Sequence, residues 1–316
     1  MKYVFNILFI VSFSSATYAQ DSSLITRTLK TIQQQQILSD SYFLKGIFPS
    51  YISKKQRYNE KQKDNNIFYN ALIGYTLNTL KSDLSDADKL IVDEIQKHNT
   101  TVFTHFKNSK GRTTYNFSRT DTTFIFPYNK WIPKLRSNLE FPDDLDCTAL
   151  ILMSENAPDS TIKQIHALMQ QYVNTGKLKT TYKSYQEEKA YSSWFGKKFP
   201  VVFDVSVLCN VLCMVQENNL EWTKADSASL QLIIQTINQK DHIEHPLFVS
   251  PYYGKTAVIL YHLARFMTIK PIAELEALKP ELAAEAKKQI QFSKSDLEKI
   301  MLNSALMKWK CQPVDI

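Results

Sequence analysis

The sequence predicts an all-α fold, an α/α toroid (barrel) built from about five to six helical hairpins. The 316-residue chain holds 6 glycines against 12% aromatic residues, which disfavours a turn-rich β sandwich and glycine-rich phosphate loops. Segments with one apolar face alternate along the chain with segments that are apolar on all sides. With 44% hydrophobic and 22% charged residues, the composition is that of a globular domain with a sizeable core.

The amphipathic segments predict an outer layer of helices. In residues 160–175, for example, Ile162, Ile165 and Met169 form one apolar stripe, and lysine and glutamine side chains occupy the opposite face. Each such segment therefore packs one face inward. The predicted outer helices are residues 22–38, 85–106, 160–175, 223–239 and 271–290.

The segments that are apolar on all sides predict an inner layer, because such a helix must be surrounded in a globular protein. The predicted inner helices are residues 66–80, 143–154, 204–216, 250–267 and 295–308. Helix starts are indicated by capping pairs and by a proline at the first helical position. These signals are Ser85 with Asp88, Thr223 with Asp226, Ser295 with Glu298, and Ser250 followed by Pro251.

The amino terminus has the order of a secretory signal peptide. Lys2 is followed by an apolar run over residues 4–13, and the small residues Thr17 and Ala19 define a cleavage site. We expect residues 1–19 to be removed and residues 20–316 to form a single domain, secreted or periplasmic and monomeric. No later apolar run reaches the roughly 18 residues that a transmembrane helix needs.

The long connections predict where a ligand binds. The outer-to-inner links, residues 107–142, 176–203 and 240–249, all lie at the end where the inner helices begin, and long loops are commonly functional. Basic residues outnumber acidic ones in the first two, within a chain of net charge +7. This pattern suits a solvated surface, or an anionic glycan or lipid phosphate; export disfavours nucleic acid. Candidate ligand residues here are Arg112, Trp131 and Trp194, among the aromatic residues Tyr115, Phe117, Tyr128, Tyr182, Tyr185 and Tyr191.

Acidic residues stand at the start of two inner helices. Asp143, Asp144 and Asp146 lie in the first turn of one, and Asp204 begins the next. Carboxylates at these positions cap the helix or, facing an apolar cavity, supply a general acid with a raised pKa. Three acids exceed what capping requires, so both interpretations remain for this group, whereas capping is favoured for Asp204.

The remaining candidates lie near the last long connection. Tyr252 and Tyr253 either pack in the core or contact a ligand, and His242 and His245 stand in a DHIEH run whose spacing does not fit a metal site. We therefore expect neither a metal nor another cofactor. His98, His105 and His166 are predicted at the surface, His262 in the core, and the four cysteines as buried thiols.

Three short segments resemble the inner-helix starts of the terpenoid cyclase and protein prenyltransferase toroids, and of bacterial relatives without assigned activity. They are residues 141–150 (FPDDLDCTAL), 203–212 (FDVSVLCNVL) and 250–253 (SPYY), and the likeness extends over about residues 68–266. The D-x-D-D motif of class II terpene cyclases supplies an acid that protonates the substrate. By this match Asp146 is the proton donor and Asp144 its neighbour, but Cys147 replaces the last Asp. The zinc-ligand set of the prenyltransferases has no clean counterpart.

Two hypotheses follow. In the first, the protein binds a small-molecule, lipid or glycan ligand at the basic, aromatic mouth of the barrel, without chemistry. In the second, it is an enzyme, either of terpenoid cyclase type acting through Asp146 or a glycan-active lyase or hydrolase. The incomplete acid motif favours the first.

Overall fold

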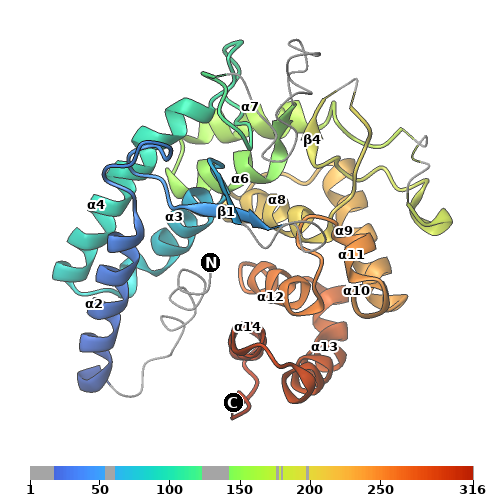
Figure 1. The fold of residues 1–316 in the computed structure, drawn as a ribbon. Coiled ribbons are helices and arrows are strands. Elements are labelled where there is room, and N and C mark those ends of the chain that lie inside the picture. The colour runs from blue at the N-terminus through green and yellow to red at the C-terminus, as the bar shows by residue number, and fades with distance from the viewer. Residues whose placement is uncertain are drawn as a thin grey trace. The chain divides into compact units, whose positions relative to one another are not determined.

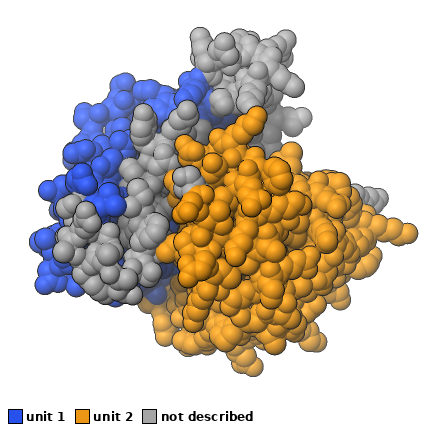
Figure 2. Space-filling model, turned by 90° about the horizontal axis from the view of Figure 1, so that it is seen from below, with its two compact units in different colours: residues 1–157 blue, residues 158–316 orange. Residues whose placement is uncertain are grey.

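The computed structural model describes residues 18–53, 61–122, 142–175, 178, 181–196 and 199–315. This part of the chain is mostly helical and its strands are short, which confirms the predicted all-α class (Figure 1). The chain divides into two compact units, residues 1–157 and residues 158–316, coloured separately in Figure 2. Each unit is described below by itself.

The first unit is mostly helical in the part that the structure describes. The elements in chain order are α2 (Tyr18–Gln35), β1 (Ser50–Ser53), β2 (Lys61–Asp64), α3 (Phe68–Leu80), η2 (Lys81–Asp83), α4 (Asp86–Phe103), η3 (Thr104–Phe106), β3 (Asp143–Asp144) and α6 (Leu145–Ser154). The antiparallel pair β1 and β2 places Ser50 opposite Asp64. Ser85 caps α4 as predicted, because its side chain accepts a hydrogen bond from the Asp88 backbone N–H.

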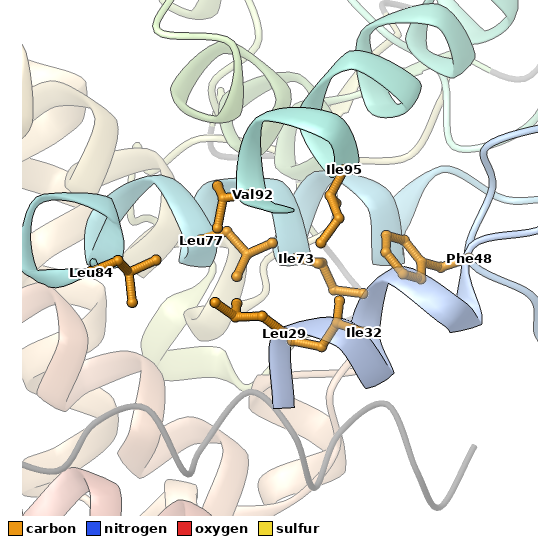
Figure 3. Close-up of a cluster of buried hydrophobic side chains, with 8 residues drawn as sticks. All are labelled: Leu29, Ile32, Phe48, Ile73, Leu77, Leu84, Val92 and Ile95. Carbon is orange, nitrogen blue, oxygen red and sulfur yellow. The ribbon is translucent and has the colours of Figure 1, made fainter. Parts of the chain in front are cut away.

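Side chains from α2, α3 and α4, together with Phe48 and Leu84 from outside these helices, form a buried hydrophobic cluster in this unit (Figure 3). Apolar residues three or four positions apart share a helix face, so each helix contributes pairs to one cluster. Burying each large aliphatic side chain contributes about 1.5–3 kcal/mol relative to exposure. The cluster contains Leu29, Ile32, Phe48, Ile73, Leu77, Leu84, Val92 and Ile95.

Helix α3 also packs closely against α6, and Gly74 makes this possible. A Cβ atom at Gly74 would collide with Ser154 Oγ of α6 and stand 2.9 Å from Asn99 Nδ2 of α4. All ten residues of α6 are buried, as predicted for an inner helix. Helix α6, whose first turn carries the acidic residues, is therefore packed inside this unit.

The second unit contains the remaining helices. In order they are α7 (Asp159–Met169), η4 (Lys183–Tyr185), β4 (Trp194–Phe195), α8 (Val205–Glu217), α9 (Lys224–Asn238), α10 (Asp241–Glu244), α11 (Pro246–Val249), α12 (Thr256–Met267), α13 (Ala273–Phe292) and α14 (Asp296–Lys308). Helix α8 is buried from Val205 to Gln216, as predicted, and α12 packs against both α8 and α14. Thr223 and Asp226 form the predicted capping box of α9, and Ser295 caps α14.

The predicted start of α12 was wrong. The helix begins at Thr256, because residues 250–254 form a turn in which Ser250 O accepts hydrogen bonds from the backbone N–H groups of Tyr253 and Gly254. Gly254 has φ +57°, a conformation that favours glycine and ends the turn. Pro251 therefore lies in a loop, and Tyr252 is presented by that loop rather than by a helix.

Candidate functional site

Asp144 is the N-cap of α6. Its carboxylate accepts a hydrogen bond of 2.6 Å from the Cys147 backbone N–H, and its own N–H donates to Tyr115 O at 2.8 Å. An N-cap carboxylate satisfies backbone groups that the helix leaves unpaired. The capping role considered for Asp144 is therefore present in the structure.

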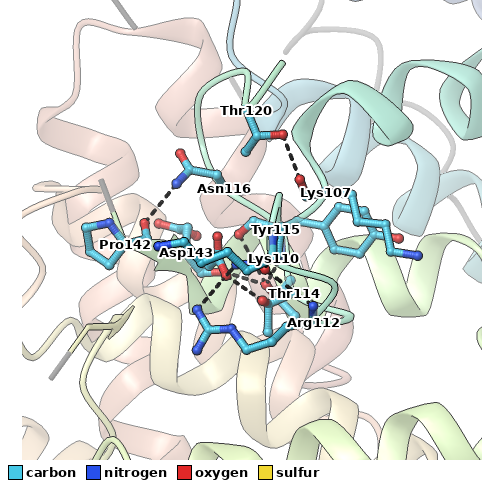
Figure 4. Close-up of polar contacts among 12 residues, drawn as sticks. Lys107, Lys110, Arg112, Thr114, Tyr115, Asn116, Thr120, Pro142 and Asp143 are labelled. Carbon is cyan, nitrogen blue, oxygen red and sulfur yellow. Dashed lines mark hydrogen bonds and ion pairs between the residues drawn. The ribbon is translucent and has the colours of Figure 1, made fainter. Parts of the chain in front are cut away.

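Asp143 is bound by the loop that precedes it in the chain. Its Oδ2 accepts hydrogen bonds from Asn108 Nδ2 at 2.6 Å, Thr114 Oγ1 at 2.5 Å and Arg112 at 2.9 Å (Figure 4). The Asp143 side chain is 4% exposed, whereas that of Arg112 is 36% exposed. Asp143 and the candidate ligand residue Arg112 thus hold the 108–114 loop against the start of α6.

The buried acids Asp144 and Asp146 affect one another. Burial, and next the negative charge of Asp146, raise the pKa of Asp144 to about 7. Burial also raises the pKa of the Cys147 thiol well above its usual value, so this thiol stays protonated and unreactive. Two close carboxyl groups of which one is protonated near neutral pH are the arrangement that general-acid chemistry uses.

Asp204 caps α8 and also reaches the 250–254 turn. Its Oδ1 accepts hydrogen bonds from the backbone of Ser206 at 2.9 Å and of Val207 at 3.1 Å, and from Ser250 Oγ at 2.7 Å. Its Oδ2 accepts one from the Tyr252 backbone at 2.9 Å. The predicted cap is present, and the same carboxylate fixes the loop that carries Tyr252.

Trp194, Phe199 and Tyr252 form a partly exposed aromatic group, named here the Trp194 cluster. Trp194 Nε1 donates a hydrogen bond of 2.6 Å to Tyr252 Oη, and the two rings meet edge to face with centroids 5.8 Å apart. The ring centroid of Phe199 lies 5.5 Å from that of Trp194, and half of Tyr252 is exposed. Two long connections, one before α8 and one before α12, supply these residues.

Tyr182, His245 and Phe248 form a second group from the same two connections, named here the Tyr182 cluster. The ring centroid of Tyr182 lies 4.2 Å from that of Phe248 and 5.5 Å from that of His245. Phe248 is 45% exposed. Because Phe248 and Tyr252 are four residues apart in the sequence, the Cα atoms of these two cluster residues lie within about 14 Å of each other.

The other residues predicted near this loop have structural roles. Tyr253 packs on His262 with ring centroids 4.6 Å apart, and its hydroxyl accepts a hydrogen bond from Asn210 Nδ2. His242 is buried and contacts Thr236 O through Nδ1; burial lowers its pKa, which keeps the ring neutral. Within the described ranges, no group of three or more histidine, cysteine or acidic side chains could hold a metal ion.

The other aromatic and basic residues predicted at the mouth of the barrel differ from one another in exposure. Tyr115, Tyr185 and Tyr191 are buried and so were wrongly assigned to a ligand surface, because their hydroxyl groups reach polar partners inside the units. The basic residues Lys183 and Lys189 are exposed, and in the sequence they lie between Tyr182 and Trp194. Trp131, Tyr128 and residues 1–17 of the predicted signal peptide lie outside the described residues.

His166 was predicted at the surface but is buried. Its Nε2 lies 2.8 Å from Asp226 Oδ2, and Tyr191 Oη donates to Asp226 Oδ1 at 2.9 Å. The apolar stripe of α7 gave a usable signal, because residue 166 stands four positions after Ile162 and shares its face. This internal cluster ties α7 to the capping box of α9.

No family model, curated protein or solved structure matches this chain. In the described part of the chain, no helix is long and apolar enough to cross a membrane.

Proposed function

We propose that the protein is an exported α/α-toroid protein that binds a glycan, neutral or anionic, on the Trp194 and Tyr182 clusters, without a catalytic set. The observation that carries this proposal is the partly exposed Trp194–Tyr252 pair, whose hydrogen bond fixes the relative orientation of the two rings. Tryptophan and tyrosine supply large, rigid, amphipathic contact areas at low entropic cost. The apolar faces of the two rings can therefore pack against the C–H groups on one side of a sugar ring.

Other features of the surface support a saccharide over a fully apolar ligand. Tyr182, Tyr252 and His245 combine ring surface with hydrogen-bonding groups, and exposed Lys183 and Lys189 add positive charge for a carboxylated or sulfated sugar. An isoprenoid would require a continuous apolar lining, whereas these side chains are polar at their edges.

The test is a titration of the full mature protein with a neutral oligosaccharide, a sulfated oligosaccharide and phosphatidylglycerol vesicles, followed by tryptophan fluorescence and calorimetry. We expect saturable binding of an oligosaccharide that Trp194→Ala abolishes. Trp222→Ala, which changes a partly exposed tryptophan outside both clusters, is the matched control and keeps binding. Binding to vesicles alone, or equal binding by Trp194→Ala and the unaltered protein, would overturn the proposal.

A second candidate function is acid catalysis by the Asp144 and Asp146 pair. The pKa of Asp144, raised to about 7, favours it, because a carboxylic acid that is still protonated near neutral pH can donate its proton to a substrate alkene or glycosidic oxygen. Incubation with isoprenoid and oligosaccharide substrates, followed by mass spectrometry, tests it. A product formed by the unaltered protein and absent with Asp144→Asn supports catalysis; conversion of no substrate removes this candidate.

A further inference from the structure

Phe248 and Tyr252, one residue from each aromatic cluster, stand on a single short segment of the chain. Both side chains are partly exposed, whereas Val249 and Ser250 between them are buried. The segment is held in place, because Ser250 Oγ donates a hydrogen bond of 2.7 Å to the buried Asp204 carboxylate. The backbone from which the two exposed rings project is therefore fixed.

Asp241, the first residue of α10, contacts both chain segments that supply the Tyr182 cluster. Its carboxylate accepts a hydrogen bond of 2.6 Å from Tyr185 Oη of η4, the short helix that begins directly after Tyr182. Its backbone carbonyl accepts one of 2.9 Å from the His245 N–H. Burial, and next the hydrogen bond with Asp241, raise the pKa of Tyr185, so its hydroxyl stays protonated and remains a donor. One residue thus connects the segment that carries Tyr182 with the segment that carries His245 and Phe248.

The two aromatic clusters therefore have separate supports. Asp204 accepts from the Tyr252 backbone and fixes the turn that carries this ring, whereas Asp241 holds η4 and with it Tyr182. Within the Tyr182 cluster, the rings of Tyr182 and Phe248 are tilted by 36° with their centroids 4.2 Å apart. A change that loosens one support is expected to leave the other cluster in place.

We propose that the two clusters are two subsites for one saccharide chain, and that Asp241 positions the second subsite through Tyr185. This inference rests on the proposed function and names its ligand as a chain of several sugars. A sugar ring on the Trp194 cluster leaves the Tyr182 cluster open to a further ring of the same chain, since residues 248 and 252 lie within about 14 Å of each other. The second contact is then intramolecular, so affinity rises with chain length.

The test measures by calorimetry the affinity of the full mature protein for gluco-oligosaccharides and for chondroitin sulfate oligosaccharides, each from the disaccharide to the octasaccharide. In the series that binds, we expect affinity to rise about tenfold or more with length. Phe248→Ala is expected to remove this rise and to leave the disaccharide affinity within about twofold of that of the unaltered protein. Phe292→Ala changes an exposed phenylalanine of α13 outside both clusters and is expected to keep the full rise.

Tyr185→Phe tests the positioning role, because it removes the hydroxyl and keeps the buried ring. We expect the octasaccharide affinity to fall about threefold or more and the disaccharide affinity to stay unchanged. Tyr191→Phe is the matched control: it removes the hydroxyl of another buried tyrosine that donates to an aspartate, and should lower Tm without changing either affinity. If Tyr185→Phe also lowers Tm alone, the positioning role of Asp241 is overturned.

The outcomes separate this inference from the proposed function. Absence of binding in both series, or binding that Trp194→Ala leaves unchanged, overturns the proposed function and the inference with it. Binding that Trp194→Ala abolishes, but that is equally tight at every chain length, overturns the inference alone. The same holds if Phe248→Ala keeps the full rise of affinity with length.

Discussion

The Asp204 carboxylate joins the first turn of α8 to the backbone of Tyr252, 48 residues later in the chain. One buried side chain therefore determines both where an inner helix starts and how an exposed aromatic ring is held. Four hydrogen bonds converge on it, two from the helix and two from the 250–254 turn.

Substitution of Asp204 tests this double role. Asn caps a helix about as well as Asp, but an amide nitrogen in place of Oδ2 cannot accept from the Tyr252 N–H. We expect Asp204→Asn to lower the free energy of unfolding by about 1–3 kcal/mol, and Asp204→Ala to lower it further. Urea unfolding measures both. Ser250→Ala, which removes one of the four bonds, should have a smaller effect; an unchanged midpoint in Asp204→Asn would contradict the assignment.

Asp144 predicts a pH dependence of stability. Its pKa of about 7 in the folded protein exceeds the unfolded value near 4, so between these values the folded state holds a proton that the unfolded chain has released. Stability therefore falls as pH rises from about 4 to about 7, by at most about 1.4 kcal/mol for each unit of the shift, and the loss belongs to the coupled pair with Asp146.

Asp144→Asn is expected to remove this dependence, because Asn caps the helix and carries no charge. Urea unfolding at about pH 5 and about pH 8 measures it. Asp143→Asn is the contrasting variant: it removes the carboxylate that accepts from Arg112, Asn108 and Thr114, and should be less stable at both pH values. If Asp144→Asn follows the pH profile of the unaltered protein, the interpretation of the raised pKa fails.

The His166–Asp226 pair predicts acid sensitivity. Burial alone raises the pKa of Asp226, but hydrogen bonds from His166 and Thr223 outweigh burial and leave the pKa below its usual value. The contribution is therefore present above the unfolded pKa near 4 and is lost as pH falls through the folded value. A double-mutant cycle with His166→Leu and Asp226→Asn is expected to give a coupling of about 1–3 kcal/mol. Additive effects of the two substitutions would show that the pair does not act as a unit.

The amino-terminal segment predicts a processing event. We expect the chain, expressed in a bacterium, to be cleaved after Ala19 and recovered from the periplasm or medium. Intact-mass measurement should give the mass of residues 20–316. Recovery of cytoplasmic protein that retains residues 1–19 would contradict the predicted export and, with it, the exclusion of nucleic acid as a partner.

Local sequence patterns predicted the helices well, because periodicity and capping act within one or two turns. The buried helices α6 and α8 and the caps Ser85 and Thr223 follow from such short-range signals, whereas for Asp144 the sequence left capping and acid chemistry both open. The start of α12 did not follow, because the competing bonds from Ser250 and Tyr252 go to Asp204, which is far away in the sequence.

The candidate site was harder to predict than the fold, because exposure depends on distant partners. His166 is buried by Asp226, 60 residues away, and Tyr185 by Asp241, 56 residues away. Adjacent residues can also differ in exposure: Tyr252 is half exposed, whereas Tyr253 packs on His262. A sequence pattern that groups such neighbours therefore cannot distinguish a ligand surface from a core.

The cysteines differ in exposure, so thiol alkylation can report how far the molecule has unfolded. Cys147, Cys209 and Cys213 are buried and Cys311 is partly exposed, and none is bonded to another. A brief pulse of a thiol-alkylating reagent should therefore add one adduct to each native molecule, at Cys311, and up to four to each molecule that has opened. The mass spectrum of a single pulse then counts the folded, partly opened and unfolded populations directly, without any introduced label.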